Sequence, residues 1–209
     1  MSKKGIVLIG AGGHARSCID VIEQDGEFQI VGLVGKNEEI GSLVLGYEVL
    51  SDDSMLLELA KRIPFALITV GQIHNPENRM NLFQSAISAG FTLASIRSPH
   101  AYVSPKASIG VGTIIMHGAV VNAGAKIGNN CIINSKALVE HDSVISDNCH
   151  ISTGVIINGH VTVLSGSFIG SGSVIKNGIS VGMNSVVGMG SVVRQDLEFQ
   201  TRWIEKGSK

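Results

Sequence analysis

Residues 131–158 read CIINSKALVEHDSVISDNCHISTGVIIN, and their branched apolar residues recur every six positions. Ile133, Val139, Ile145, Ile151 and Ile157 keep this step, and a small residue stands two positions before nearly every one of them. Neither an α-helix nor a flat sheet has a period of six residues. A parallel β-helix does, because each short strand turns one branched side chain inward and each corner needs a small residue.

The six-residue step continues without a slip from Val103 to Val193. Glycine or asparagine often follows the branched residue, which is typical of corners with unusual backbone dihedral angles. Cys131 and Cys149 occupy the small position, so we interpret them as packing residues. The pattern predicts a parallel β-helix, which we assign to residues 98–196, followed by a tail at 197–209.

The first 97 residues have a different pattern, in which strand-like and helix-like segments alternate. Such alternation predicts a parallel sheet and a Rossmann-like domain over residues 1–97. Ligands of such domains bind at the carboxyl ends of the strands. The expected strands are 5–10, 29–34, 65–71 and 92–96, and the expected helices are 14–24, 51–62 and 78–90.

The overall composition argues against several functional classes. The chain of 209 residues has a net charge of −1 and no basic block, so we expect no nucleic-acid partner. The first apolar run is too short for a signal sequence or a membrane span. The three cysteines fit no metal or disulfide spacing. We therefore expect a cytoplasmic protein.

A glycine-rich turn joins the first predicted strand to the first predicted helix. We assign Gly10, Gly12, Gly13 and His14 to substrate binding, because backbone amides at a helix N-terminus hold anions. A dinucleotide site needs an acid at the end of the second strand, but the chain there reads Gly35-Lys36, so we reject NAD. The alternative is a turn that has lost its ligand.

The residues at the start of the third predicted helix also have two possible roles. Asn78 and Arg79 stand there, next to the expected ligand edge of the sheet. Either residue fits a phosphate contact, and either fits an ordinary role at the start of the helix.

Unbroken hexads of this kind resemble those of the hexapeptide-repeat acyltransferases. The resemblance implies a triangular left-handed β-helix with three hexads per coil, a homotrimer, and active sites in the clefts between subunits. With eighteen residues per coil, Gly159 stacks on His141 and His160 on Asp142. An imidazole beside a carboxylate can act as a general base. The alternative is a solvated polar surface of the β-helix.

A narrower resemblance covers nearly the whole chain. The order Asn134, Val139-Glu140-His141-Asp142, His150-Ile151-Ser152 and Gly159 resembles bacterial sugar acetyltransferases of surface-glycan synthesis. This group includes UDP-N-acetylbacillosamine N-acetyltransferase and sialic acid O-acetyltransferase. The resemblance implies that His141 is the catalytic base, Asp142 its partner and Asn134 a further catalytic residue, while His150 and Gly159 contact acetyl-CoA.

The implied function is N-acetylation of a nucleotide-linked amino-deoxy sugar by direct transfer from acetyl-CoA, without a metal. O-acetylation of sialic acid is the alternative, and a trimeric sugar-binding scaffold without activity is the non-enzymatic one. Carbonic anhydrases of the same fold bind zinc through histidines whole coils apart. No two of His117, His141, His150 and His160 are separated by a multiple of eighteen, which disfavours such a zinc site.

Overall fold

The computed structural model describes residues 3–204, which form two compact units. The first unit contains residues 3–71 and 77–99, and the second contains residues 72–76 and 100–204. The boundary after residue 99 lies close to the predicted one at residue 97. Nothing in the sequence pattern predicts that the short segment 72–76 belongs to the second unit.

The first unit is built on a six-stranded sheet in the order β3-β4-β2-β1-β5-β6. All neighbours are parallel except the hairpin of β3 and β4. The apolar run in β1 is fully buried because helices cover both faces of the sheet. The strands are β1 Lys4–Ile9, β2 Phe28–Val34, β3 Leu43–Val44, β4 Tyr47–Ser51, β5 Phe65–Ile68 and β6 Thr92–Leu93; β7 Ile96–Arg97 follows.

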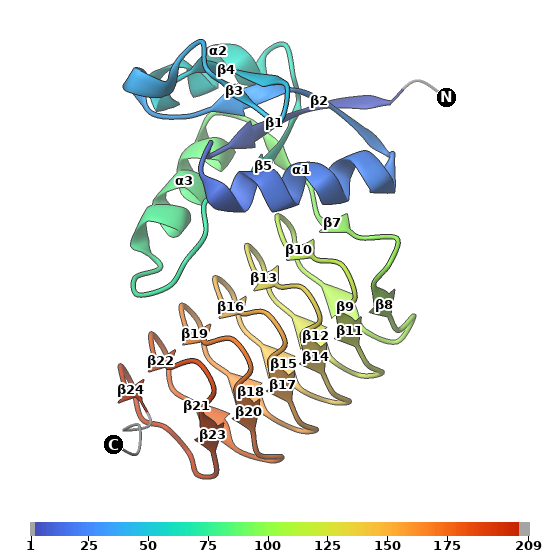
Figure 1. Cartoon of the computed structure of the whole chain (residues 1–209), viewed down its shortest axis with the longest axis vertical. Helices are drawn as coiled ribbons and strands as arrows, with labels where there is room; N and C mark the ends of the chain where they lie inside the picture. The colour runs from blue at the N-terminus through green and yellow to red at the C-terminus, as the bar shows by residue number, and fades with distance from the viewer. Residues whose placement is uncertain (1–2, 205–209) are drawn as a thin grey trace. The chain divides into compact units, whose positions relative to one another are not determined.

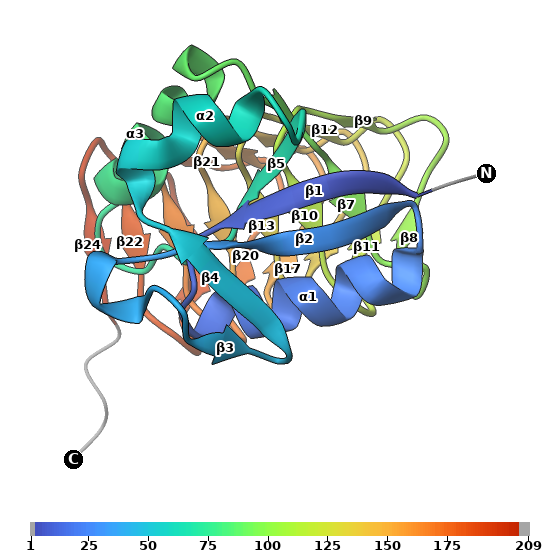
Figure 2. The ribbon, with the colours of Figure 1, turned by 90° about the horizontal axis from the view of Figure 1, so that it is seen from above.

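The helices α1 (Gly13–Asp25), α2 (Leu56–Ala60) and α3 (Glu77–Ser88) flank this sheet. Figure 2 shows α1 on one side of the sheet and α2 and α3 on the other. Leu56 of α2 and Ala86 of α3 pack with Val7 and Ile9 of β1 in one buried cluster. The central strands therefore lie between two apolar layers, as expected for a Rossmann-like domain.

Two local features of the first unit differ from the sequence prediction. The helix expected at 51–62 is shorter, because the 3-10 turn η2 (Asp53–Met55) precedes α2, and Asp52 accepts a hydrogen bond from the Ser54 backbone N–H. The hairpin of β3 and β4 was not predicted. Its turn residues Leu45 and Gly46 both have positive φ, a conformation usually signalled by asparagine or glycine rather than leucine.

The second unit is a left-handed β-helix whose two-residue strands recur every six residues (Figure 1). From β8 to β20, each strand pairs in parallel with the strand eighteen residues later, as Val139 does with Ile157. The predicted branched residues fill one continuous core. The strands are β8 Tyr102–Val103, β9 Ser108–Ile109, β10 Ile114–Ile115, β11 Val120–Val121, β12 Lys126–Ile127, β13 Ile132–Ile133, β14 Leu138–Val139, β15 Val144–Ile145, β16 His150–Ile151, β17 Ile156–Ile157, β18 Thr162–Val163, β19 Phe168–Ile169, β20 Val174–Ile175, β21 Ser180–Val181, β22 Val186–Val187, β23 Val192–Val193 and β24 Arg202–Trp203.

The small residues at the corners have a second role besides their size. Hydroxyl groups at this position donate to a backbone carbonyl fifteen residues later: Ser143 to Asn158, Ser167 to Gly182 and Ser173 to Gly188, at 2.8–2.9 Å. The same oxygens accept from the backbone N–H eighteen residues later, as Ser143 does from Val161. Buried polar groups thus find partners in the next coil.

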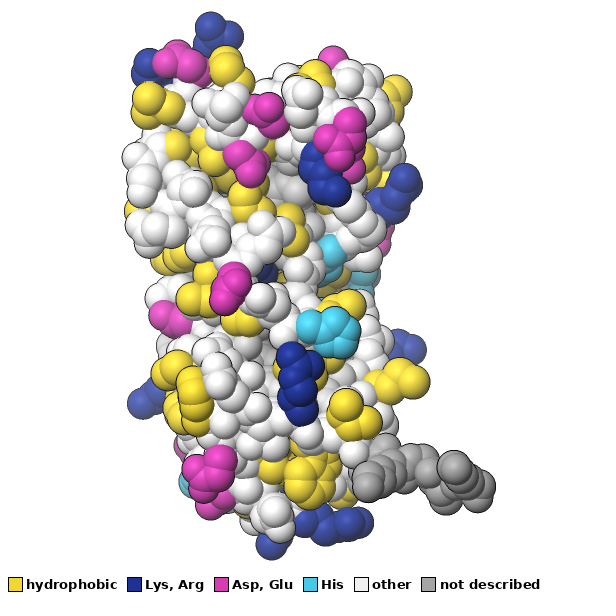
Figure 3. Space-filling model, turned by 90° about the vertical axis from the view of Figure 1, so that its left-hand side faces the viewer, with side chains coloured by type: hydrophobic (Ala, Val, Ile, Leu, Met, Phe, Trp, Pro, Cys, Tyr) yellow, Lys and Arg dark blue, Asp and Glu magenta, His cyan; other side chains and the backbone are white. Residues whose placement is uncertain are grey.

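The end of the β-helix is closed by β24, where Trp203 packs against the apolar core. Of the predicted tail, residues 205–209 lie outside the described residues. No helix in the described part of the chain combines the length and apolar character needed to cross a membrane. On the face shown in Figure 3, positive and negative side chains are interspersed, so this face has no basic patch.

Candidate active site

The candidate active site lies at the corner of the β-helix that follows β14 and β17. The register of these strands stacks Leu138 on Ile156, so His141 stands beside Gly159, and Asp142 beside His160, in neighbouring coils. The backbone continues this register, because the His160 N–H donates to the His141 carbonyl at 3.1 Å. The stacking predicted from a coil of eighteen residues is confirmed.

Asp142 and His160 both occupy the left-handed position of their hexads. The residue at this position has positive φ in every hexad from Gly112 to Gly190, and most of these residues are glycine or asparagine. Asp142 has φ 59° and His160 has φ 57°. A residue with a Cβ costs about 1–2 kcal/mol there. Residues other than glycine that adopt this strained backbone conformation are therefore candidates for a functional role.

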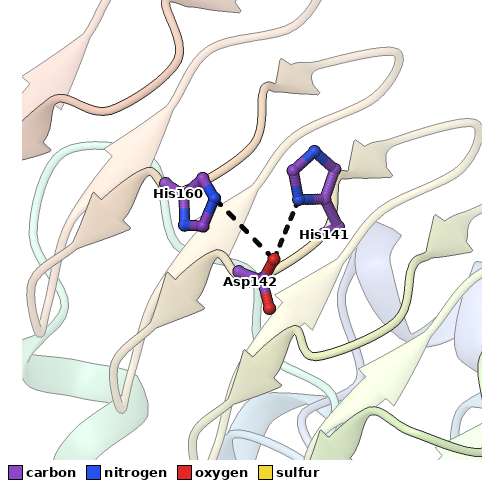
Figure 4. A group of neighbouring side chains, drawn as sticks. All are labelled: His141, Asp142 and His160. Atoms are coloured by element: carbon purple, nitrogen blue, oxygen red, sulfur yellow. Dashed lines mark hydrogen bonds and ion pairs between the residues drawn. The ribbon is translucent and has the colours of Figure 1, made fainter.

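His141 and Asp142 form a hydrogen-bonded pair. The Nδ1 atom of His141 lies 2.9 Å from Oδ2 of Asp142, and both side chains are about half exposed (Figure 4). The hydrogen bond with His141 holds the pKa of Asp142 below its usual value. Because an ionised carboxylate can only accept, the hydrogen in this bond belongs to Nδ1. The lone pair of Nε2 is then available to take a proton.

Gly159 provides the space for the imidazole of His141. A Cβ on residue 159 would lie 2.7 Å from Nε2 and 2.8 Å from Cε1 of that ring, so only glycine fits here without a shift. Among residues 3–204, the Gly159 backbone N–H has no hydrogen-bond acceptor. A cavity of about 450 Å³ opens at this corner, lined by Glu140, His141, Asn158, Gly159, His160 and Asn177.

Two neighbours of the pair were not assigned a role from the sequence. Gly124 lies one coil before Asp142, and a Cβ there would collide with the Asp142 carboxylate. His160 approaches the carboxylate from the other side, with Nε2 at 3.8 Å from Oδ2. Glu140, although adjacent in sequence, is held by Asn122 at 2.9 Å and by the His141 backbone N–H.

The structure brings the predicted residues Asn134 and His150 together as a second group. The Nδ2 atom of Asn134 lies 3.1 Å from Nε2 of His150, and Nδ1 of His150 lies 2.6 Å from the Gln72 carbonyl. His150 is buried, and the Gln72 side chain is anchored to the carbonyls of Asn148 and Gly166. Since a carbonyl only accepts, His150 donates through Nδ1 and accepts through Nε2, so both ring nitrogens are engaged.

A second candidate site lies in the first unit, at the carboxyl ends of the strands. Gly10, Gly12, Gly13 and His14 line a cavity of about 400 Å³, as the sequence predicts for a ligand site at this edge. The N-terminus of α1 has no side-chain cap, which leaves its backbone amides for a ligand. Other lining residues include Gly35, Lys36, Glu39, Asp53, Gly71 and Asn78.

The acids Glu39 and Asp53 were not expected in this cavity. Glu39 belongs to the 3-10 turn η1 (Asn37–Glu39), and its carboxylate accepts a hydrogen bond of 2.7 Å from the Lys36 backbone N–H. Burial and the neighbouring Asp52 raise the pKa of Asp53. Arg79 is not a phosphate ligand in this structure, because its buried guanidinium donates to the carbonyls of Ile68 and Val70.

Comparisons with known proteins agree with both halves of this description. Residues 5–86 match the family model of the PglD N-terminal domain. A crystal structure of a histidine-to-asparagine mutant of perosamine N-acetyltransferase from Caulobacter crescentus, in complex with CoA and GDP-perosamine, shares 32% identity. The match covers 94% of this chain and 91% of that one, with a TM-score of 0.88.

Two further solved structures align over 94% of this chain and 94% of their own. The acetyltransferase domain of PglB from Neisseria gonorrhoeae FA1090, in complex with acetyl coenzyme A, is 28% identical with a TM-score of 0.86. WeeI from Acinetobacter baumannii AYE, at 22% identity and a TM-score of 0.81, shares the fold. A comparison with curated protein sequences gives no match. The chain belongs to the PglD-like family of sugar N-acetyltransferases, which join a PglD N-terminal domain to a left-handed β-helix and use acetyl-CoA.

Proposed function

We propose that this acetyl-CoA-dependent N-acetyltransferase of nucleotide-linked amino sugars transfers the acetyl group directly to the sugar amine, with His141 as the general base. One observation carries the proposal. The bond from Nδ1 of His141 to Asp142 leaves the Nε2 lone pair beside Gly159, in an open cavity. A base of this kind contributes typically 10²–10⁴-fold to the rate.

The reaction needs no covalent enzyme intermediate. The amine nitrogen attacks the thioester carbonyl, and Nε2 of His141 takes the proton that the nitrogen loses. The oxyanion of the tetrahedral intermediate accepts a hydrogen bond from the Gly159 N–H, which is worth roughly 3 kcal/mol in comparable sites. When the carbon–sulfur bond breaks, the imidazolium returns the proton to the CoA thiolate, and Asp142 stabilises the charge on the ring in between.

The acceptor is a nucleotide-linked amino-deoxy sugar, held through its diphosphate by the backbone amides at Gly12 and Gly13. The perosamine N-acetyltransferase was solved with such a compound, GDP-perosamine. Glu39 and Asp53 line the same cavity and supply acceptors for ribose hydroxyls or base N–H groups.

A homotrimer completes the proposal, and one face of the β-helix supports it. The outward residues of β8, β11, β14, β17, β20 and β23 are all apolar or aromatic: Tyr102, Val120, Leu138, Ile156, Val174 and Val192. The face formed by β9, β12, β15, β18 and β21 presents mostly polar residues instead. An apolar stripe of this length is typical of an interface between subunits. His141 lies two residues after the end of β14 of this face, so a neighbouring subunit would border the site.

The role of Asn134 and His150 belongs to the same proposal. Within the chain the two side chains are bonded to each other, and Asn134 follows β13, at the other edge of the apolar stripe. Packing of neighbouring subunits on the stripe would bring this edge close to the His141 corner. Asn134 would then act across the interface, and His150 would hold it in position.

The decisive experiment measures acetylated product by chromatography with acetyl-CoA and three acceptors: GDP-perosamine, a UDP-linked 4-amino-4,6-dideoxy sugar and sialic acid. We expect turnover of a nucleotide-linked amino sugar and a loss of about 10²–10⁴-fold in His141→Asn. His117→Asn, at the equivalent corner position of another hexad, is the matched control and should retain activity. Turnover of sialic acid alone would overturn N-acetylation in favour of O-acetylation, and no turnover with any acceptor would favour a sugar-binding scaffold.

A further inference from the structure

Three potential metal ligands meet at the candidate active site. One ligand atom each from His141, Asp142 and His160 lies within 4.8 Å of the other two. The shared carboxylate oxygen Oδ2 lies 2.9 Å from Nδ1 of His141 and 3.8 Å from Nε2 of His160 (Figure 4). All three side chains are exposed, so an ion has direct access from solvent.

The two imidazoles are already arranged around the carboxylate. Their rings stand at an interplanar angle of 89° with centroids 5.2 Å apart, so the two nitrogens approach Oδ2 from different directions. The left-handed backbone at Asp142 and His160 fixes where both side chains begin. The arrangement therefore needs only small side-chain rotations to surround an ion, and solvent can fill the remaining coordination positions.

The ligand types and spacing favour a divalent transition metal. Two imidazole nitrogens and one carboxylate oxygen are ligands that Zn²⁺ prefers, with bonds of about 2.0–2.2 Å and a tetrahedral geometry. Such bonds place neighbouring ligand atoms roughly 3.3 Å apart, a value that lies between the two distances seen here. Mg²⁺ and Ca²⁺ prefer all-oxygen sites and fit this cluster less well.

We propose that His141, Asp142 and His160 bind Zn²⁺ reversibly and that the bound ion inhibits acetyl transfer. Inhibition rests on the proposed role of His141 as the base. Zn²⁺ takes the Nδ1 lone pair, and the single proton of the neutral ring moves through solvent from Nδ1 to Nε2. The Nε2 lone pair that should accept the amine proton is then occupied. The ion also displaces the hydrogen bond between His141 and Asp142.

The spacing of the histidines explains why the sequence pattern did not reveal this site. Zinc ligands stacked in one column of the β-helix are eighteen residues apart, whereas His141 and His160 are nineteen apart. They meet because each flanks the same carboxylate, His141 from the preceding residue and His160 from the next coil. The site is therefore diagonal across two coils.

Binding is tested directly by calorimetric titration of the metal-free protein with ZnCl₂, without substrates. We expect one ion per chain in the wild type. In His160→Asn the affinity should fall about tenfold or more, because a ligand is lost while asparagine tolerates the left-handed backbone. His117→Asn should bind like the wild type. Equal affinity in His160→Asn and wild type, or no binding in the wild type, would overturn the site, whatever the protein's activity.

Inhibition is tested by product formation measured by chromatography, because the thiol of released CoA itself binds zinc. Each variant is compared with itself in EDTA and at a Zn²⁺ concentration that saturates the wild type. We expect the wild type to lose at least about 90% of its turnover and to recover it in excess EDTA, while His160→Asn is inhibited much less. Full turnover with Zn²⁺ bound would overturn the inhibitory role but not His141 as the base, which the His141→Asn comparison tests separately.

Discussion

The imidazole of His141 lies directly against the backbone of Gly159, so close that a single methyl group on residue 159 would stand 2.7 Å from Nε2. This contact joins the two groups that the proposed reaction needs, a base and an amide N–H donor. They come from residues eighteen apart, in the turns that follow β14 and β17, whose register is fixed. The geometry of the site is thus set by the repeat itself rather than by a flexible loop.

Gly159→Ala should therefore lower kcat/KM by about 10²–10³-fold, since the methyl group displaces the base and covers the amide donor. The thermal midpoint should change little, because the ring of His141 is half exposed and can swing away. Thr153→Ala, at the same hexad position six residues earlier but with an exposed side chain, is the control and should keep full activity. Normal kinetics in Gly159→Ala would exclude the proposed oxyanion donor.

The acid stability of the protein should report on the pair of His141 and Asp142. The hydrogen bond from His141 holds the pKa of Asp142 below its usual value, so the folded state takes up this proton less readily than the unfolded state. The pair's contribution to stability is then complete above the ordinary pKa of aspartate and is lost as pH falls through the lowered value.

Thermal unfolding of wild type and Asp142→Asn between pH 3 and pH 7 tests this assignment. Asparagine preserves the left-handed backbone but cannot ionise, so the difference in melting temperature should be constant near neutral pH and shrink below about pH 4. An undiminished difference at pH 3 would mean that Asp142 contributes through something other than its charge.

The strained corner positions predict a stabilising substitution away from the site. Lys136 has φ 58° at the same hexad position as Asp142, with an exposed side chain. Lys136→Gly should stabilise the protein by roughly 0.5–1 kcal/mol, the relief of the left-handed backbone minus the entropy cost of glycine. Gly154 has φ 66° and open space where a Cβ would stand, so Gly154→Ala should destabilise by a similar amount through the backbone strain alone. Urea unfolding measures both, and equal stabilities in all three proteins would contradict the expected strain.

The apolar stripe predicts which surface change abolishes assembly. Ile156 lies in the middle of the stripe with 36% of its surface exposed in the single chain. Ile156→Asp should convert the proposed trimer into monomers, as measured by light scattering after size-exclusion chromatography, because a buried unpaired charge is costly. Thr162→Asp, on the polar face, should leave the trimer intact. A trimer that survives Ile156→Asp would place the interface elsewhere.

The three cysteines should be inert to thiol reagents in the folded protein. All are buried, and burial raises the pKa of Cys18 to about 12 and that of Cys149 well above its usual value. Because the thiolate is the reactive form, Ellman's reagent should modify them only after denaturation. Fast modification of the native protein would show that the fold opens readily around at least one of these cysteines.

The hexad pattern predicted the β-helix because one residue class performs one structural task at every step. The branched residues from Ile115 to Val193 fill the core as expected, and the stacking of Gly159 on His141 follows from counting residues. Stacking within a column depends only on the repeat, so the amino-acid sequence alone is enough to place Gly159 beside His141.

Contacts that leave the column could not be found by counting. His160 lies diagonally across two coils from His141, with ring centroids 5.2 Å apart, and Gln72 holds His150 from a segment 78 residues away. Glu39 and Asp53 reach their cavity through short 3-10 turns, which have no periodic apolar signal. Such contacts depend on side-chain rotamers and loop paths, neither of which a repeat specifies.

The unbroken coil has a consequence for how the length of this chain can vary. Insertion of a single hexad would move every later residue onto the next face of the triangular β-helix. The apolar stripe would then be interrupted, and the part after the insertion would lie on a different face. Insertion of three hexads after Gly190 would instead extend the stack by one turn, roughly 4.8 Å, with every face preserved. Between residues 141 and 159 even that change would separate the base from its glycine. Natural or engineered variants of this protein should therefore grow or shrink in blocks of eighteen residues, and only outside that interval.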